Sequence, residues 1–216
     1  YRPGDRVVAD PNIFCESCYY CKQNKQIHCE NIQVIGNTRN GAFAEFVTAP
    51  ERCLFSAMDL DLVQAAMAEP LGCVINAHNK VVIPLGGNVV IVGAGTIGLT
   101  AMQLAKLNGA TVIITDIVDT KLAYAKDNGA DYTINAKNEN TYDRVMEITN
   151  GMGANVTINA VCTKKSFEDA VEVTSVAGRV VELGFGADAR EIPPVLVTKK
   201  ELNICGSRLQ TGRFPV

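Results

Sequence analysis

The chain has 216 residues, of which 47% are hydrophobic and 20% are charged, a composition that is ordinary for a folded globular protein and far from a disordered one. Lys and Arg together number 20 and Asp and Glu 23, so the chain lacks the basic excess by which proteins bind nucleic acids or anionic lipids. Every apolar run is too short to span a bilayer and the first residues lack a signal-peptide core, so we expect a cytoplasmic protein that binds neither nucleic acid nor membrane.

The first part of the chain, residues 1–58, has the pattern of strands and loops without a long helical period. A short apolar run at 6–9 follows a Pro-Gly turn and predicts one strand. The run at 42–49 lies between a glycine and a proline and predicts a second strand.

A helix is expected next, because Asp59 or Asp61 can cap its N-terminus and apolar residues follow at helical spacing. The pair Glu69-Pro70 interrupts this pattern. Since proline has no backbone N–H, the helix should kink or restart there. We expect it to continue over 71–80.

Strands and helices alternate from about residue 88 onward. The run 89–92 is continuously β-branched, as in a strand that helices cover on both faces. Further strands are expected at 111–115, 132–134, 156–160, 179–183 and 202–205. Helices are expected around 97–105, 119–128, 140–149 and 165–175. Such alternation predicts an α/β fold with a doubly wound parallel sheet.

Half of the eight cysteines crowd into one short segment, at Cys15, Cys18, Cys21 and Cys29. Zinc takes four soft donors in a tetrahedron, and two-residue spacers let successive thiols turn onto one ion. Four thiolates fill the coordination sphere, so the spacing favours a structural zinc site over a catalytic one. Metal binding would also supply folding energy to a loop with few apolar residues of its own.

Other interpretations of this segment stay open. The thiols could pair as disulfides or hold an iron–sulfur cluster, whose ligand spacing is related. His28 could replace Cys29 as a ligand. A small cysteine-zinc lobe can also bind nucleic acid, but Lys22 and Lys25 are balanced by acidic neighbours. The four scattered cysteines are expected to be buried as small hydrophobic residues.

A glycine-rich turn follows the strand at 89–92 and opens the next helix, which is the context in which G-x-G-x-x-G binds a dinucleotide. The first glycine permits the tight turn, the second lets a pyrophosphate approach the backbone, and the third lets the helix pack closely on the strand. The pyrophosphate is expected at the positive helix N-terminus. The candidate cofactor-binding residues of this turn are Gly93, Gly95, Thr96, Ile97 and Gly98.

Asp116 stands at the end of the second strand of this alternating region. A carboxylate there can accept hydrogen bonds from both hydroxyls of the adenosine ribose, and it would repel a 2′-phosphate, which favours NAD over NADP. Asp116 could instead cap the following helix. Lys121 could reach the same ribose or be a solvated charge on that helix.

With these motifs the chain resembles the zinc-containing medium-chain dehydrogenases, and most of all their sorbitol, threonine and sugar-acid dehydrogenase branch. The segments that carry the resemblance are Gly4 to Val8, the four clustered cysteines, Gly41 to Phe46, Glu69 to Leu71, Gly93 to Gly98, and Asp116. The resemblance implies that residues 1–72 are part of a mostly β, GroES-like catalytic domain with a structural-zinc lobe at 15–29. It implies that residues 73–216 form an NAD-binding Rossmann domain.

The resemblance also implies roles for single residues. Glu69 matches a glutamate that lies at the catalytic zinc, directly or through one water; the alternative is an exposed helix carboxylate. The matches to cofactor-proximal segments are Leu183, Gly184 and Phe185, along the nicotinamide, and Ser207 and Arg208, which also lie near a subunit interface.

The implied function is that of an oxidoreductase that transfers a hydride between NAD and a secondary alcohol, a polyol or a sugar acid, at a catalytic zinc in a homodimer or homotetramer. Family members carry a Cys and a His ligand of that zinc upstream of the Gly-Asp-Arg-Val segment with which this chain begins. We therefore expect a fragment that lacks this N-terminal catalytic-zinc segment and also the C-terminal end of the family's catalytic domain. It should bind NAD and one structural zinc but turn over no alcohol by itself. A zinc-independent medium-chain reductase and a non-catalytic NAD(H)-binding protein are the alternatives.

Overall fold

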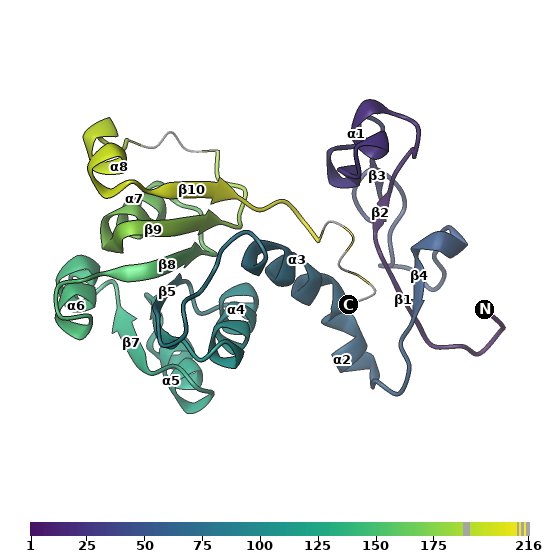
Figure 1. The fold of residues 1–216 in the computed structure, drawn as a ribbon. Coiled ribbons are helices and arrows are strands. Elements are labelled where there is room, and N and C mark those ends of the chain that lie inside the picture. The colour runs from purple at the N-terminus through teal and green to yellow at the C-terminus, as the bar shows by residue number, and fades with distance from the viewer. Residues whose placement is uncertain (188–190, 211, 213, 215–216) are drawn as a thin grey trace. The chain divides into compact units, whose positions relative to one another are not determined.

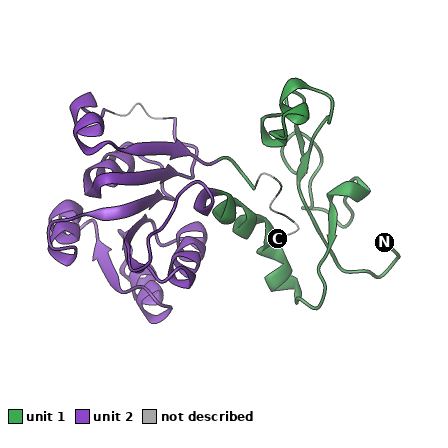
Figure 2. Cartoon of the chain, viewed as in Figure 1, with its two compact units in different colours: residues 1–76, 208–216 green, residues 77–207 purple. Residues whose placement is uncertain are grey.

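The computed structural model describes residues 1–187, 191–210, 212 and 214, and the chain divides into two compact units (Figure 2). Unit 1 comprises Tyr1–Asn76 and Arg208–Val216, and unit 2 comprises Ala77–Ser207.

These units differ from the predicted ranges 1–72 and 73–216 in two places: the boundary between them falls after Asn76, and the C-terminal residues from Arg208 onward group with unit 1. The side chain of Asn76 donates to the carbonyl oxygens of Arg208 and Leu209, at 3.2 and 2.8 Å. The side chain of Gln210 donates to Oδ1 of Asp10 at 2.7 Å. These long-range hydrogen bonds attach residues 208–210 to unit 1.

Unit 2 is built on a parallel sheet, which confirms the predicted doubly wound α/β fold (Figure 1). Its strands are β5 (Asn88–Val92), β6 (Thr111–Asp116), β7 (Tyr132–Asn135), β8 (Ala154–Asn159), β9 (Thr174–Glu182) and β10 (Asn203–Gly206). Their order across the sheet is β10-β9-β8-β5-β6-β7, and neighbouring strands are parallel. The chain runs outward from β5 through β6 to β7 and returns on the other side of β5 at β8. The topological switch point therefore lies between β5 and β8.

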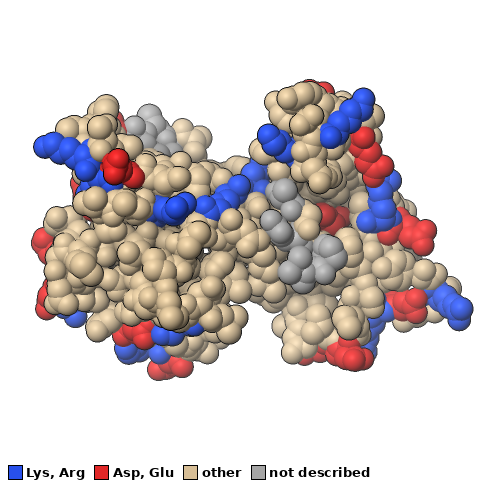
Figure 3. Space-filling model, in the orientation of Figure 1, with Lys and Arg blue, Asp and Glu red and all other residues tan. Residues whose placement is uncertain are grey.

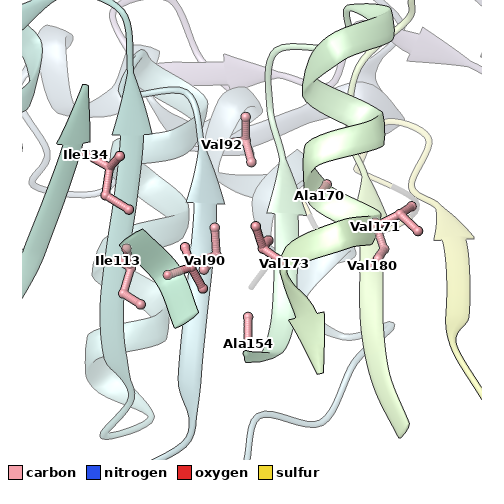
Figure 4. Close-up of a cluster of buried hydrophobic side chains, with 10 residues drawn as sticks. Val90, Val92, Ile113, Ile134, Ala154, Ala170, Val171, Val173 and Val180 are labelled. Carbon is pink, nitrogen blue, oxygen red and sulfur yellow. The ribbon is translucent and has the colours of Figure 1, made fainter. Parts of the chain in front are cut away.

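Helices connect these strands and cover both faces of the sheet. They are α4 (Thr96–Leu107), α5 (Asp119–Asp127), α6 (Thr141–Ile148), α7 (Lys164–Val173) and α8 (Pro194–Lys200). Val90 and Val92 of β5 share a buried cluster with Ala170 of α7 (Figure 4), whereas Ile91 lies against Gly98 of α4. Successive strand residues point to opposite faces, so β5 is covered on both sides, as its β-branched run predicts.

The helix α8 has no counterpart among the predicted elements. It begins with Pro194, whose fixed φ suits the first helical turn, and Glu201, the residue that follows its last turn, has the left-handed conformation, with φ 48°. No helix in the described part of the chain has the length and apolar character that crossing a bilayer requires.

Unit 1 is made of short strands and helices. They are β1 (Val7–Ala9), β2 (Asn12–Ile13), α1 (Tyr19–Lys22), η1 (Gln26–His28), β3 (Gln33–Val34), η2 (Glu51–Cys53), β4 (Leu54–Ser56), α2 (Leu62–Ala66) and most of α3 (Ala68–His78), whose last two residues belong to unit 2. β1 pairs antiparallel with β4, and β2 with β3. Asp61 caps α2 in a capping box with Gln64, and the helix restarts as α3 with Pro70 in its first turn, both as predicted.

The strand predicted at 42–49 is wrong. This segment forms bends and irregular backbone, and the side chains of Phe43 and Phe46 are exposed. An apolar run becomes a strand only where a neighbouring strand supplies backbone partners and a core covers one face. The described residues offer this segment neither.

Candidate functional site

The four clustered cysteines meet around one point in unit 1. Their sulfurs all lie within 4.8 Å of one another, and Sγ of Cys15 is 4.0 Å from Sγ of Cys21. Thiolates about 2.3 Å from a tetrahedral zinc lie about 3.8 Å from one another. The four side chains therefore fit one closed tetrahedral ion after a small contraction.

Local backbone structure brings these thiols together. Cys18 precedes α1, Cys21 lies within it, and Cys29 directly follows η1. The backbone N–H of Cys18 donates to Sγ of Cys15 at 3.4 Å, and the N–H of Cys15 donates to Sγ of Cys29 at 3.3 Å. Such N–H donors stabilise the thiolate form that a metal binds.

The four thiols, which we call the cysteine cage, differ in pKa. The backbone N–H of Ser17, then its hydroxyl and the N–H of Cys18, lower the pKa of Cys15 to about 5. Burial, followed by the neighbouring thiols, raises the pKa of Cys21 to about 12. A bound divalent cation favours the thiolate at every ligand, so it would ionise the whole cage.

His28 is not part of this cluster. Its side chain is exposed and its ring centroid lies 6.0 Å from that of Tyr20, whereas Cys29 is buried with its sulfur in the cage. All eight cysteines are free thiols, so the cage holds no disulfide. The arrangement favours four thiolate ligands over the histidine alternative.

The glycine-rich turn joins β5 to α4. A Cβ on Gly98 would lie 1.8 Å from the carbonyl oxygen of Gly93, so only glycine permits this packing. A Cβ on Gly95 would meet nothing within 4 Å. Gly95 is the N-cap of α4, so the first backbone N–H groups of the helix, beginning with Thr96 and Ile97, have no partner within the helix. The open space above Gly95 fits the close approach of a pyrophosphate.

Asp116 ends β6 beside this turn. Its Oδ2 accepts the backbone N–H of Ala94 at 2.8 Å, and its Oδ1 accepts those of Ile117 and Val118 at 2.8 and 3.0 Å. The N-cap of α5 is Val118, without a side-chain cap, so Asp116 braces the turn rather than capping α5. Nζ of Lys121 lies 3.9 Å from Oδ2 and its side chain is half exposed, which puts Lys121 at the rim.

A cavity of about 800 Å³ opens at the carboxyl ends of β5 and β6, and Gly93, Asp116 and Lys121 line it. That volume is within the usual range of small-molecule sites. Lining residues that the sequence analysis did not single out include Ile117, Val118, Ala136, Asn140, Val161 and Thr163, which follow the carboxyl ends of parallel strands, where that rule would have found them. Others lie within α6 and α7, among them Tyr142, Lys165, Asp169 and Glu172, and the rule does not reach them.

The segment from Leu183 to Phe185, which is expected along the nicotinamide, directly follows β9. The N–H of Leu183 donates to the carbonyl oxygen of Asn159 at 3.0 Å, and the side chain of Phe185 is exposed. Ser207, which follows β10, is buried, and its N–H donates to the carbonyl oxygen of Glu182 at 2.8 Å. Leu183 and Ser207 therefore lie at the carboxyl ends of their strands, the same end of the parallel sheet at which the glycine-rich turn lies.

Glu69 lies in α3 and is partly buried, so it is not a freely solvated helix carboxylate. The thiol of Cys73 donates to its Oε1 at 3.4 Å, and burial, followed by the charge of Glu69, raises the pKa of Cys73 to about 12. Among the described residues, only the four-cysteine cage gathers three or more His, Cys, Asp or Glu ligands. The residues around Glu69 therefore do not form a complete metal site of their own.

The face of the molecule that Figure 3 shows carries basic and acidic side chains next to one another on both units. Near the cysteine cage, Arg52 pairs with Glu16 at 3.1 Å. Phosphate binding needs a basic surface of one sign.

Two family models match the chain. The zinc-binding dehydrogenase model matches residues 96–215, and the alcohol dehydrogenase GroES-like domain model matches residues 1–59. The sorbitol dehydrogenase of Halalkalibacterium halodurans is 32% identical over 215 residues, which cover 97% of this chain and 63% of that protein.

Solved structures share the fold over nearly the whole chain. A zinc-binding dehydrogenase from Sinorhizobium meliloti 1021, bound to NADP, superposes with a TM-score of 0.94 at 31% identity and covers 99% of this chain and 64% of its own. An alcohol dehydrogenase from Escherichia coli CFT073, complexed with NADH, has a TM-score of 0.90 at 32% identity over 98% of this chain and 63% of its own. This chain thus spans less than two thirds of the length of these relatives. Since the zinc-binding dehydrogenase model alone covers more than half of the residues, the chain belongs to the zinc-binding dehydrogenase family, among the medium-chain alcohol and polyol dehydrogenases.

Proposed function

We propose that this chain is the NAD-binding and structural-zinc part of a dehydrogenase that oxidises a secondary alcohol, of the polyol or sugar-acid class, by hydride transfer to NAD. The proposal rests on one observation. Asp116 binds the glycine-rich turn at the carboxyl ends of the parallel strands, beside the cavity of about 800 Å³. Dinucleotides bind at this edge, next to a topological switch point.

The residues of unit 2 fit the parts of NAD in order. The N–H groups at the start of α4 bind the pyrophosphate, and Gly95 leaves the space for it. Asp116 accepts hydrogen bonds from the adenosine ribose, and Lys121 stands at the rim. The segment Leu183–Phe185 lies along the nicotinamide. NAD, when bound, supplies the hydride acceptor.

The cysteine cage has a structural role in this proposal. Four thiolates leave no coordination position for a substrate, so the ion they hold orders the lobe and takes no part in the chemistry. A zinc ion fits the donor set and spacing of Cys15, Cys18, Cys21 and Cys29. The cage also disfavours the zinc-independent reductase alternative.

Glu69 is the residue that we assign to the catalytic metal of the whole protein, directly or through one water. One carboxylate does not hold a zinc ion, and the described residues complete no such site. The purified chain is therefore expected to bind cofactor and to oxidise no alcohol. Zinc-dependent alcohol oxidation by this chain alone would overturn that expectation.

Two measurements on the purified, reduced chain test the proposal. Fluorescence titration should show saturable binding of NADH, with NADPH weaker. Elemental analysis should return one zinc per chain. Absence of both cofactor binding and bound zinc would refute the proposal. Cofactor binding without catalysis in the complete protein would favour the non-catalytic NAD(H)-binding alternative.

A further inference from the structure

The carboxyl ends of β8 and β9 are joined by one buried amide. Asn159, the last residue of β8, is fully buried. Its Nδ2 donates to both carboxylate oxygens of Glu182, at 2.9 and 3.1 Å, and to Oγ of Ser166 at 3.2 Å. Its Oδ1 accepts the backbone N–H groups of Val161 and Cys162, at 3.2 and 3.4 Å. The amide thus fixes the turn after β8 to the last residue of β9.

A steric contact lies directly beyond this amide. A Cβ on Gly184 would stand 2.0 Å from Sγ and 2.8 Å from Cβ of Cys162. Cys162 is buried and has φ 65°, a left-handed conformation that favours glycine. Residue 184 can therefore rest this close to the turn only because it has no side chain, and the buried thiol sets the limit of its approach.

The position of this contact points to one half of the cofactor. Asp116 lies at the end of β6, on one side of the switch point, and the cavity extends from there to Val161 and Thr163, which follow β8. β8 and β9 lie on the other side of β5. A dinucleotide extends across the switch point, so its second nucleotide must lie over the ends of β8 and β9.

We infer that Asn159 and Cys162 are positioning residues for the nicotinamide half of NAD. Together they fix where the backbone of Leu183 to Phe185 lies, and so they set the distance between this backbone and the cofactor. The inference rests on the proposed NAD binding. Neither residue needs to touch the cofactor; both act through Gly184 and Glu182.

A steric cycle between residues 184 and 162 tests the contact. Gly184→Ala should displace the segment and weaken NADH binding about tenfold, while the affinity for ADP-ribose, which lacks the nicotinamide, stays within about twofold. Adding Cys162→Gly removes both clashing atoms and suits the left-handed backbone. The double variant should therefore bind NADH again within about threefold of the wild type.

An exchange of polar groups tests the amide. Asn159→Asp places a second carboxylate against Glu182, so NADH binding should weaken while ADP-ribose binding is kept. Combining Asn159→Asp with Glu182→Gln restores one amide facing one carboxylate. The combined variant should regain NADH affinity.

The outcomes separate this inference from the proposed function. If the wild-type chain binds neither NADH nor ADP-ribose, both the proposed function and this inference are wrong. If the wild type binds both ligands, the inference alone fails in any of three cases: Gly184→Ala binds NADH normally, both ligands weaken in parallel, or neither combined variant recovers. Circular dichroism melting of each variant shows whether it is folded.

Discussion

The backbone N–H of Ala94 donates a hydrogen bond of 2.8 Å to Oδ2 of Asp116. This bond ties the glycine-rich turn to the end of β6, so one carboxylate both shapes the turn and faces the cavity. Because three backbone N–H groups already hold it, the carboxylate is oriented before a ribose arrives.

Asp116→Asn is expected to weaken NADH binding about tenfold and to narrow the preference for NADH over NADPH. The neutral amide loses an acceptor for the turn and for the ribose, and it no longer repels a 2′-phosphate. Fluorescence titration with both nucleotides measures the two effects. Asp119→Asn is the matched control, since Asp119 accepts a hydrogen bond from Asn135 and not from the turn. An unchanged nucleotide preference in Asp116→Asn would contradict the assignment.

Two glycines of the same turn should respond differently to alanine. Gly98→Ala forces a Cβ to 1.8 Å from the carbonyl oxygen of Gly93, so the melting temperature should fall by more than about 4 °C. Gly95→Ala meets open space, so it should change the melting temperature little and still abolish NADH binding. Thermal melting and NADH titration on both variants make the comparison. NADH binding retained in Gly95→Ala would show that no pyrophosphate approaches there.

Removal of one cage thiol should cost both metal and stability. Cys29→Ser replaces a soft ligand, so bound zinc should fall from one per chain toward none and unit 1 should melt earlier. Cys205→Ser is the control, because Cys205 lies in β10 and its thiol donates to the carbonyl oxygen of Val180. Elemental analysis with circular dichroism melting compares the two. Full zinc content in Cys29→Ser would exclude Cys29 as a ligand.

Acid should destabilise unit 2 through His78. Burial lowers the pKa of His78 from 6.5, although its contact with Asn108 opposes this, and its Nδ1 has no hydrogen-bond partner among the described residues. The unfolded chain therefore takes up this proton at a higher pH than the native chain does. The free energy of unfolding should then fall as the pH drops below about 6.5, until the lowered native pKa is reached.

Urea unfolding followed by circular dichroism suits this test, because the chain has no tryptophan. In His78→Gln the free energy of unfolding should fall less steeply over this pH range than in the wild type. His28→Gln should leave it unchanged, since that side chain is exposed. An equal decline in wild type and His78→Gln would assign the effect to other groups.

Short-range patterns could be predicted from the sequence because their causes are local. The spacing of Cys15 to Cys29 predicts a shared centre, since a few backbone turns suffice to bring the thiols together. The turn from Gly93 to Gly98 is local in the same way. The β-branched run of β5 predicts a doubly covered strand, because burial on both faces demands it.

Contacts between distant residues needed the tertiary structure. Nothing in the sequence pairs Gln210 with Asp10, Asn159 with Glu182, or Gly184 with Cys162. Each of these depends on which strands become neighbours, and many segments compete for that role. The segment 42–49 shows the same limit, because its apolar pattern is that of a strand but no neighbour in the described residues pairs with it. Local chemistry in the sequence thus determined what the metal cage and the cofactor turn are made of. The packing of the sheet decided which side chains hold them in place, since hydrogen bonds and steric contacts form only between groups that the fold brings within reach.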